Sequence, residues 1–220
     1  MDFALTEEQQ AIFDMARDFG AEHIAPHSRD WERAGTIPKD LWPRIAQLGF
    51  GGLYVSEDFG GSGLTRLDAT LVFEALAMAD PAVGAFLSIH NMCGGMIDKF
   101  GKPEDKERWL PDLCSMAKVF SYCLTEPGSG SDAAALRTRA DKKGDRYVIN
   151  GQKVWISRIQ HSDLMILLAR TTPLDQVRKK SEGMSIFLVD IEEAQQKGMT
   201  VKPTEPLFKA TFPKIDWAEM

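Results

Sequence analysis

A segment rich in glycine and hydroxyl groups is the part of the sequence best suited to binding a ligand. Residues 122–132 read Tyr-Cys-Leu-Thr-Glu-Pro-Gly-Ser-Gly-Ser-Asp, and we call them the turn segment. A strand that runs into a Pro-Gly turn presents amides and hydroxyls that can donate hydrogen bonds to an anionic or carbonyl-rich ligand. The sequence has neither a lysine-containing phosphate loop nor a dinucleotide-binding glycine fingerprint. The residues alone leave two interpretations open, a ligand-binding loop and an ordinary polar turn.

Few other residues are candidates for chemistry. Glu126 lies inside the turn segment, but a carboxylate before Pro-Gly more often ends a strand or turn than acts as a base. His90 lies in an apolar run and is predicted to be a core histidine with a hydrogen-bond partner. The cationic residues 178–180 are predicted to lie in a solvated loop. No group of His, Asp and Glu has the spacing of a metal site, so we assign no metal ligand and no catalytic residue.

Composition and charge exclude several classes of protein. The chain has 220 residues, 44% of them hydrophobic, and its 32 acidic and 26 basic residues give a net charge of −6. These values predict a folded core and argue against a nucleic-acid partner. No run approaches the ~18 apolar residues of a membrane helix, and the acidic start of the chain differs from a secretory signal. We therefore expect a cytoplasmic protein without a membrane span.

The cysteines point to the same kind of compartment. The chain has three, Cys93, Cys114 and Cys123, and none forms a C-x-x-C pair with another. An odd number without paired spacing argues against a disulfide framework or a thiolate zinc site. We predict reduced, buried thiols.

Periodicity predicts helices in the first half of the chain and strands in the second. Thr6 and Gln9 form a capping-box pattern before the first helical run. Further helical runs are expected at about 38–48, 65–79, 81–100 and 102–109. Short β-rich runs are expected at 119–124, 146–149, 165–168 and 184–189. The pair Asn150-Gly151 between two such runs is a strong hairpin signal.

These elements predict an α+β fold with two domains. Residues 1–115 are expected to form an all-helical domain, and residues 116–203 an antiparallel β-domain that contains the turn segment. Residues 204–220 form a divergent tail. The 81–100 run is rich in alanine and glycine, which we interpret as close helix packing rather than as a surface for a flat ligand.

Six segments, taken together, resemble the acyl-CoA dehydrogenase family of flavoproteins, over about residues 5–201. They lie in the family's order and spacing: residues 5–9, 38–49, 59–63, 101–111, 122–132 and 150–157. The resemblance implies a helical N-terminal domain followed by a β-barrel-like middle domain. The stretch from Cys114 to Asp132 is most similar to short- and branched-chain members.

The resemblance also implies roles for particular residues. The FAD-lining residues would be Tyr122, Cys123, Leu124, Thr125, Glu126, Pro127, Gly128, Ser129, Gly130, Ser131, Trp155, Ile156 and Ser157. Thr125 would meet the polar edge of the isoalloxazine ring, Trp155 would lie against its face, and Ser157 would donate a hydrogen bond near N5. Ser131 would also contact the acyl-CoA substrate. An aromatic wall and a donor near the hydride-accepting atom suit flavin chemistry.

The reaction that the family resemblance implies is the α,β-dehydrogenation of a fatty acyl-CoA thioester. A carboxylate removes the α-proton while the β-hydrogen leaves as a hydride to flavin N5. Electrons would then pass to an electron-transfer flavoprotein. Complete family members are expected to be homo-oligomers that act in fatty acid metabolism.

The sequence departs from the family in two places. Family members continue into a C-terminal four-helix bundle that supplies the catalytic glutamate, and nothing in this sequence matches it, so we expect a truncated chain that is weakly active or inactive alone. Arg158 stands where many members carry Gly or Asn, and we expect it to be a solvated turn residue. Three alternatives stay open: a non-catalytic flavin- or acyl-CoA-binding module, a subunit completed by a separate helical domain, and an acyl-CoA oxidase.

Overall fold

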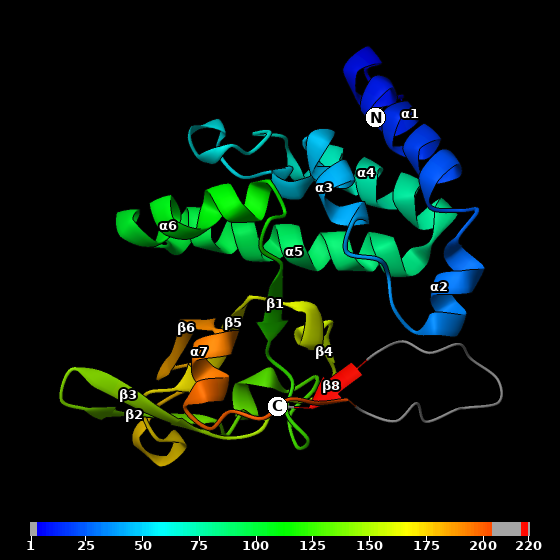
Figure 1. Ribbon diagram of the computed structural model, residues 1–220. Helices are drawn as coiled ribbons and strands as arrows, with labels where there is room; N and C mark the ends of the chain where they lie inside the picture. The colour runs from blue at the N-terminus through cyan, green and yellow to red at the C-terminus, as the bar shows by residue number, and fades with distance from the viewer. Residues whose placement is uncertain (1–3, 204–216, 220) are drawn as a thin grey trace. The chain divides into compact units, whose positions relative to one another are not determined.

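The computed structural model describes residues 4–203 and 217–219, and these residues form two compact units. The first unit extends to Val119 and is helical, and the second begins at Phe120 and contains the strands (Figure 1). The predicted tail over 204–220 lies outside the described residues except for 217–219.

Six α-helices build the first unit. They are α1 (Glu7–His23), α2 (Ser28–Ala34), α3 (Leu41–Gln47), α4 (Arg66–Ala79), α5 (Pro81–Phe100) and α6 (Pro103–Cys114). Short 3₁₀ turns at Phe50–Gly52 and Glu57–Phe59 connect α3 to α4. The predicted helical runs at 38–48, 65–79 and 81–100 are therefore confirmed to within a few residues.

Local capping fixes where the main helices begin. Thr6 caps α1, because its side chain accepts a hydrogen bond from the amide of Gln9 and the Gln9 side chain accepts one in return. Thr65 and Asp68 form the same reciprocal pair at the start of α4. Each cap contributes about 1 kcal/mol by satisfying amides that have no partner inside the helix.

Aromatic stacking and small residues hold the helical core together. The rings of Trp42 and Phe86 stack with centroids 3.7 Å apart and planes 5° from parallel. Gly94 on α5 lies so close to α6 that a Cβ there would sit 2.8 Å from Leu113 Cδ2. The small residues of α5 thus serve helix packing, as predicted. His90 is also the predicted core histidine, because it is fully buried and its Nε2 lies 2.9 Å from the Leu113 carbonyl oxygen.

Helix α6 extends further than expected. The sequence predicted its end near Trp109, before Pro111, yet it continues through the proline to Cys114. An internal proline costs a helix about 3 kcal/mol. The turn that follows Pro111 buries Leu113 and Cys114, and burial of such side chains contributes about 1.5–3 kcal/mol each, which offsets that cost.

The second unit contains one mixed sheet and one small antiparallel sheet. Its elements are β1 (Phe120–Cys123), β2 (Arg139–Lys143), β3 (Arg146–Asn150), β4 (Ile156–Ser157), β5 (Leu164–Arg170), β6 (Met184–Asp190), α7 (Ile191–Gln196), β7 (Lys202–Pro203) and β8 (Trp217–Glu219). The larger sheet has the order β1-β5-β2-β3, with β6 also paired to β5. The smaller sheet has the order β4-β8-β7.

The prediction of an antiparallel, barrel-like domain is therefore wrong in two respects. Strand β1 pairs with β5 in parallel, with Phe120 opposite Leu164, and β2 meets the end of β5 in parallel as well. The sheet is mixed and does not close. Alternation and β-rich composition identify strands, but strand direction depends on the long connections between them, which those patterns do not report.

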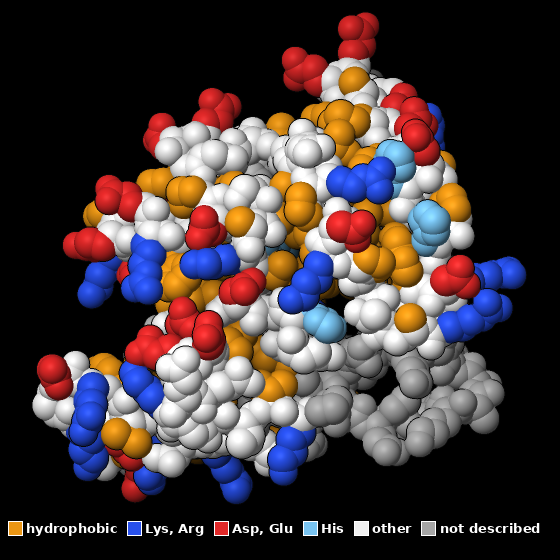
Figure 2. All heavy atoms as spheres, in the orientation of Figure 1, with side chains coloured by type: hydrophobic (Ala, Val, Ile, Leu, Met, Phe, Trp, Pro, Cys, Tyr) orange, Lys and Arg blue, Asp and Glu red, His pale blue; other side chains and the backbone are white. Residues whose placement is uncertain are grey.

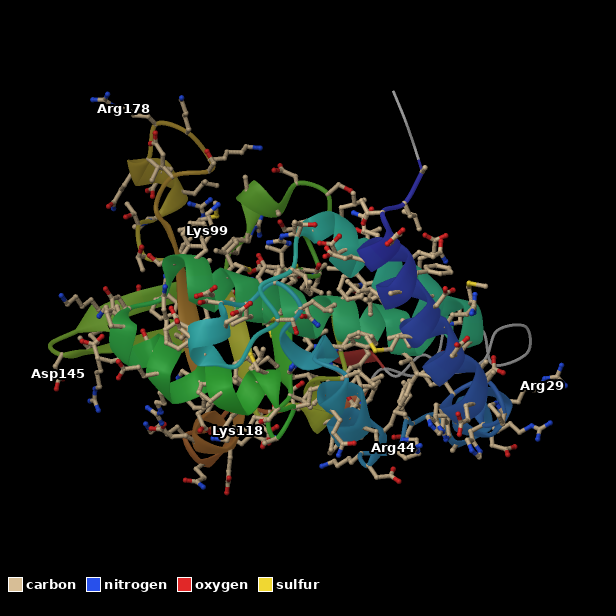
Figure 3. The ribbon with its side chains drawn as sticks, turned by 90° about the horizontal axis from the view of Figure 1, so that it is seen from above. Arg29, Arg44, Lys99, Lys118, Asp145 and Arg178 are labelled. Atoms are coloured by element: carbon tan, nitrogen blue, oxygen red, sulfur yellow. The ribbon has the colours of Figure 1, made fainter. Side chains whose placement is uncertain are left out.

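The hairpin also lies elsewhere than predicted. Strands β2 and β3 pair so that Lys143 faces Arg146, which leaves Gly144 and Asp145 as a two-residue loop. Gly144 adopts φ +64°, the left-handed conformation that such loops require. Asp145 marks the outer end of this hairpin (Figure 3). Asn150 instead ends β3, where it pairs with Arg139.

The surface carries mixed charge. On the face shown in Figure 2, the described Lys and Arg side chains are interspersed with Asp and Glu. Residues 178–180 are exposed on the β5–β6 connection, as predicted, and the Arg178 side chain extends outward from it (Figure 3). Among the described residues, no helix has the length and apolar character needed to cross a membrane.

Candidate functional site

The turn segment reverses the chain immediately after β1. The Glu126 amide donates to the Ser129 carbonyl at 3.1 Å, and the Ser129 amide donates back to the Glu126 carbonyl at 3.0 Å. Pro127 and Gly128 form the tip between them. The Ser129 hydroxyl donates to the Asp132 carbonyl at 2.6 Å. These bonds engage some of the donors and acceptors of the segment and fix the shape of its tip.

The two glycines of the turn segment have open space around them. A Cβ placed on Gly128 or Gly130 would meet no atom of the chain within 4 Å. Neither glycine has a positive φ, so the backbone conformation does not require glycine at either position. This contrasts with Gly94, which helix packing requires. The fold itself therefore does not explain these two glycines, whereas the close approach of a ligand to the backbone would.

A second segment next to the turn segment contains an aromatic residue in an unusual conformation. This Trp segment (residues 153–157) leads into β4, and Trp155 adopts φ +60° with 44% of its surface exposed. Left-handed backbone costs a non-glycine residue roughly 1–2 kcal/mol. Such strain is concentrated at ligand-binding and active sites.

Backbone and side-chain hydrogen bonds hold the two segments together. The Val154 amide donates to the Thr125 carbonyl at 2.9 Å. The Ser121 hydroxyl on β1 donates to the Ser157 carbonyl at 3.0 Å and lies 2.7 Å from the Ser162 hydroxyl. The turn segment and the Trp segment are therefore neighbours, although about 30 residues separate them in the sequence.

A buried ion pair joins the same two segments. Lys153 Nζ lies 2.8 Å from Glu126 Oε1, and the side chains are only 2% and 7% exposed. Lys153 also donates to the Leu124 carbonyl at 2.9 Å. The Glu126 carboxylate accepts from the amides of Arg137 at 2.6 Å and Thr138 at 2.9 Å. All of these groups belong to the turn segment, the Trp segment or the two residues that precede β2.

The two charges are stabilised against burial. Burial alone would raise the pKa of the Glu126 carboxyl, but hydrogen bonds from Lys153 and from the Thr138 and Arg137 positions outweigh it and lower that pKa. Burial lowers the pKa of Lys153, and Glu126 opposes this. The carboxylate is thus ionised, buried and fully engaged. It does not have the raised pKa or the access to substrate of a general base.

The structure divides the predicted site residues between core and surface. Cys123, Glu126, Ser129 and Ile156 are buried, and Cys123 Sγ lies 3.5 Å from Met165 Sδ in the core. Tyr122, Leu124, Thr125 and Ser157 are half-buried. Pro127, Gly128, Gly130, Ser131 and Trp155 are exposed. A ligand can therefore reach only the half-buried and the exposed residues.

Sequence reasoning missed three buried cations near this site. Lys153 lies in the 150–157 segment, but nothing in the local sequence pattern distinguishes it from a surface lysine. Arg170 is 4% exposed and donates to four carbonyls, two in the loop after the turn segment and two in the β5–β6 loop. Arg158 was expected to be solvated, but it is buried, has φ +56° and donates to the Phe120 carbonyl. Among the described residues, no cluster of three or more metal-ligating side chains is present.

Family models match both units of the chain. The model described as "Acyl-CoA dehydrogenase, N-terminal domain" matches residues 6–117. The model described as "Acyl-CoA dehydrogenase, middle domain" matches residues 121–211.

Individual proteins are similar over most of the chain. The mitochondrial isobutyryl-CoA dehydrogenase of Dictyostelium discoideum is 44% identical over 211 residues, which cover 92% of this chain and 50% of that protein. The Bos taurus protein of the same name is 48% identical over 167 residues, covering 76% and 40%. A glutaryl-CoA dehydrogenase from Mycobacterium smegmatis, solved in complex with FADH2, is 25% identical with a TM-score of 0.84, covering 97% and 52%. The chain spans about half the length of the curated relatives it matches.

Proposed function

The chain belongs to the acyl-CoA dehydrogenase family, and from this premise we propose that it carries the flavin-lining part of an FAD-dependent acyl-CoA dehydrogenase. One structural observation supports the proposal above the others. The exposed, strained Trp155 belongs to a segment bonded directly to a turn whose two glycines have open space around them. An aromatic wall beside an accessible backbone is the arrangement that a flat, polar-edged cofactor needs.

The residues present fit FAD, and each has a distinct task. When bound, FAD supplies the hydride acceptor of the reaction. Trp155 would pack against the isoalloxazine ring, and the Thr125 and Ser157 hydroxyls would donate hydrogen bonds to its polar edge. Gly128 and Gly130 would let the backbone approach the cofactor without a side chain intervening. Ser131, which is exposed at the end of the turn, would contact the acyl-CoA.

The base that removes the α-proton is not among the residues assigned to this site. Glu126, the carboxylate of the turn segment, is buried and paired with Lys153. This chain matches about half of each relative. We propose that the base comes from the other half of the family fold. In that case the residues described here bind, orient and shield the reacting groups, and proton removal depends on a carboxylate from elsewhere.

We further propose a short, branched acyl-CoA as substrate. Two of the three similar proteins named above are isobutyryl-CoA dehydrogenases, and both are named as mitochondrial. Electron-transfer flavoprotein is the proposed electron acceptor, and a homo-oligomer the proposed assembly. The cytoplasmic location expected from the sequence stays a prediction.

Titration of the full chain with FAD tests the proposal. We expect a flavin absorbance band that remains after desalting and a weaker band for Trp155→Ala, whose dissociation constant for FAD should rise by about 10-fold because the aromatic wall is lost. Phe100→Ala is the matched control, since Phe100 is 72% exposed on α5 in the helical unit. Equal retention of FAD by the two variants would contradict the assignment of Trp155.

Anaerobic addition of acyl-CoA separates the remaining alternatives. Bleaching of the flavin band by isobutyryl-CoA but not by a long-chain acyl-CoA would support the proposed substrate class, and it would contradict the proposed origin of the base, because a base within this chain would then remove the α-proton. Binding of FAD without bleaching would favour the non-catalytic binding module or a subunit that needs a separate helical domain. Bleaching followed by rapid reoxidation in air would favour an oxidase. A chain that binds neither FAD nor acyl-CoA would overturn the proposal.

A further inference from the structure

We propose that the buried Glu126–Lys153 ion pair positions the turn segment against the Trp segment and thereby sets the affinity and the environment of the bound flavin. The inference rests on the proposed function, because it takes both segments to line FAD. The side chains of the pair are only 2% and 7% exposed, which leaves little surface for contact with substrate or cofactor. Glu126 and Lys153 are therefore positioning residues and not catalytic ones.

Lys153 connects the two segments at two points. Its ammonium lies 2.8 Å from Glu126 Oε1 and donates to the Leu124 carbonyl at 2.9 Å. Between these two contacts, the Thr125 carbonyl accepts the Val154 amide at 2.9 Å. Three consecutive residues of the turn segment are thus bonded to two consecutive residues of the Trp segment. This arrangement fixes their register, because a shift by one residue would break all of these bonds together.

The carboxylate extends the same network to a third segment. Glu126 Oε2 accepts the Arg137 amide at 2.6 Å, and Oε1 accepts the Thr138 amide at 2.9 Å. These amides directly precede β2 at Arg139. The turn segment is consequently held at Glu126 against the residues that lead from its end into β2. Pro127, Gly128, Gly130 and Ser131 are exposed between these anchors, whereas Ser129 is buried.

Apolar side chains at positions 126 and 153 could not make the hydrogen bonds that Glu126 and Lys153 make. Lys153 is 1% exposed and Glu126 is 7% exposed, so each charge is removed from water and depends on the other. Substitution of one partner leaves the other charge buried and leaves a carbonyl or amides without a partner. The two segments would then separate or shift, and the flavin-lining groups on both, Thr125 and Trp155, would move relative to each other.

A matched pair of lysine variants tests the proposal. Lys153→Met removes the buried cation, while Lys180→Met removes a cation that pairs with Asp132 at 3.1 Å with 63% of its side chain exposed. We expect Lys153→Met to weaken FAD binding by about 10-fold or more and Lys180→Met by less than about 2-fold. At saturating FAD, the visible circular dichroism of the bound flavin should change only in Lys153→Met. A residue that merely stabilised the fold would leave that spectrum unchanged.

Exchange of single amides provides a test that needs no flavin. In the full chain without FAD, the Val154 amide reports the contact between the two segments, and the amides of β5 report the sheet. We expect Lys153→Met to accelerate exchange at Val154 by about 10-fold relative to β5, and Lys180→Met to leave the ratio unchanged. The double variant Glu126→Gln/Lys153→Met should be no worse than either single variant, since the two residues act as one unit.

The outcomes separate this inference from the proposed function. If the unchanged chain binds FAD and Lys153→Met matches Lys180→Met in affinity, spectrum and exchange, the positioning role is overturned and the flavin site stands. If the unchanged chain does not bind FAD, the proposed function fails, and Val154 exchange alone decides whether the pair fixes the two segments. If Lys153→Met does not fold, the double variant is measured in the same way. Failure of both to fold would overturn the positioning role, because the pair would then serve the whole fold.

Discussion

At the scale of single residues, Arg170 shows how much one buried side chain can organise. Its Nε donates to the Leu136 carbonyl at 3.0 Å and its Nη1 to the Glu182 carbonyl at 3.0 Å. Its Nη2 donates to the carbonyls of Ala134 and Lys180, both at 2.6 Å. The planar guanidinium suits this task, because its donors point in fixed, divergent directions. Arg170 thereby connects the loop after the turn segment to the β5–β6 loop.

We predict that Arg170→Met destabilises the protein by about 2–4 kcal/mol, because four carbonyls lose a charged donor. Urea unfolding measures the loss. Arg178→Met on the exposed loop is the control and should change the free energy of unfolding by less than about 0.5 kcal/mol. A similar small change for Arg170→Met would show that water replaces the lost donors.

Glu126 predicts a specific dependence of stability on pH. Its pKa lies below the ordinary value of 4.5 in the folded protein, because the bonds from Lys153 and its other donors outweigh burial. A carboxyl with a lowered folded pKa contributes stability that is present above about pH 4.5 and lost as pH falls through the folded pKa. The difference in unfolding free energy between the unchanged chain and Glu126→Gln should therefore be largest near pH 6 and shrink towards pH 3. A difference that does not vary with pH would contradict this assignment.

At the scale of elements, α5 holds the helical unit together through buried polar groups as well as apolar packing. Asn91 Oδ1 accepts the Leu53 amide at 2.6 Å, and its Nδ2 donates to the carbonyls of Phe50 at 2.9 Å and Leu87 at 3.1 Å. Asn91 is fully buried, so these partners have no alternative in water. One side chain thus fixes the 3₁₀ turn at Phe50–Gly52 against the middle of α5.

We predict that Asn91→Leu lowers the free energy of unfolding by about 2–4 kcal/mol, although leucine and asparagine differ little in volume. The substitution leaves the Leu53 amide and the Phe50 carbonyl buried without a partner, at about 1–3 kcal/mol each. Ser88→Ala on the same helix is the control, because the Ser88 hydroxyl only bonds the Ala85 carbonyl on an exposed face. Thermal or urea unfolding of both variants checks the prediction, and equal losses would refute it.

The elements also show which parts of the fold the sequence could predict. Thr6 and Gln9 predicted the start of α1, because a cap is decided within four residues. The β-rich run at 165–168 predicted the strand β5, but the parallel pairing of β5 with β1 depends on connections of tens of residues. Lys153 could not be predicted as buried, since its partner Glu126 lies 27 residues away and only the folded chain brings them together. The residue types predicted the turn segment, but they did not predict the Glu126–Lys153 ion pair that holds it.

At the scale of the whole molecule, each of the two units contains a hydrophobic cluster built only from its own residues. The helical core includes Trp42, Leu53, Leu76 and Phe86, and all of its members lie at or before Val119. The core of the second unit includes Cys123, Ile156 and Leu167, and all of its members lie after Phe120. A core of its own is what allows a segment to fold independently.

We therefore predict that residues 1–119 fold without the rest of the chain. The main buried polar groups of this unit, including His90 and Asn91, find their partners at Leu113, Leu53 and Phe50, which are all inside the fragment. The fragment should show a helical far-ultraviolet spectrum and a single cooperative unfolding transition, with a free energy within the ~5–15 kcal/mol of natural domains or somewhat below it. Trp42→Ala in the fragment should reduce that free energy by about 3–5 kcal/mol, because it removes half of the stacked pair with Phe86. A fragment without cooperative unfolding would mean that the helical core needs residues beyond Val119, and the boundary between the two units would not be a boundary of independent folding.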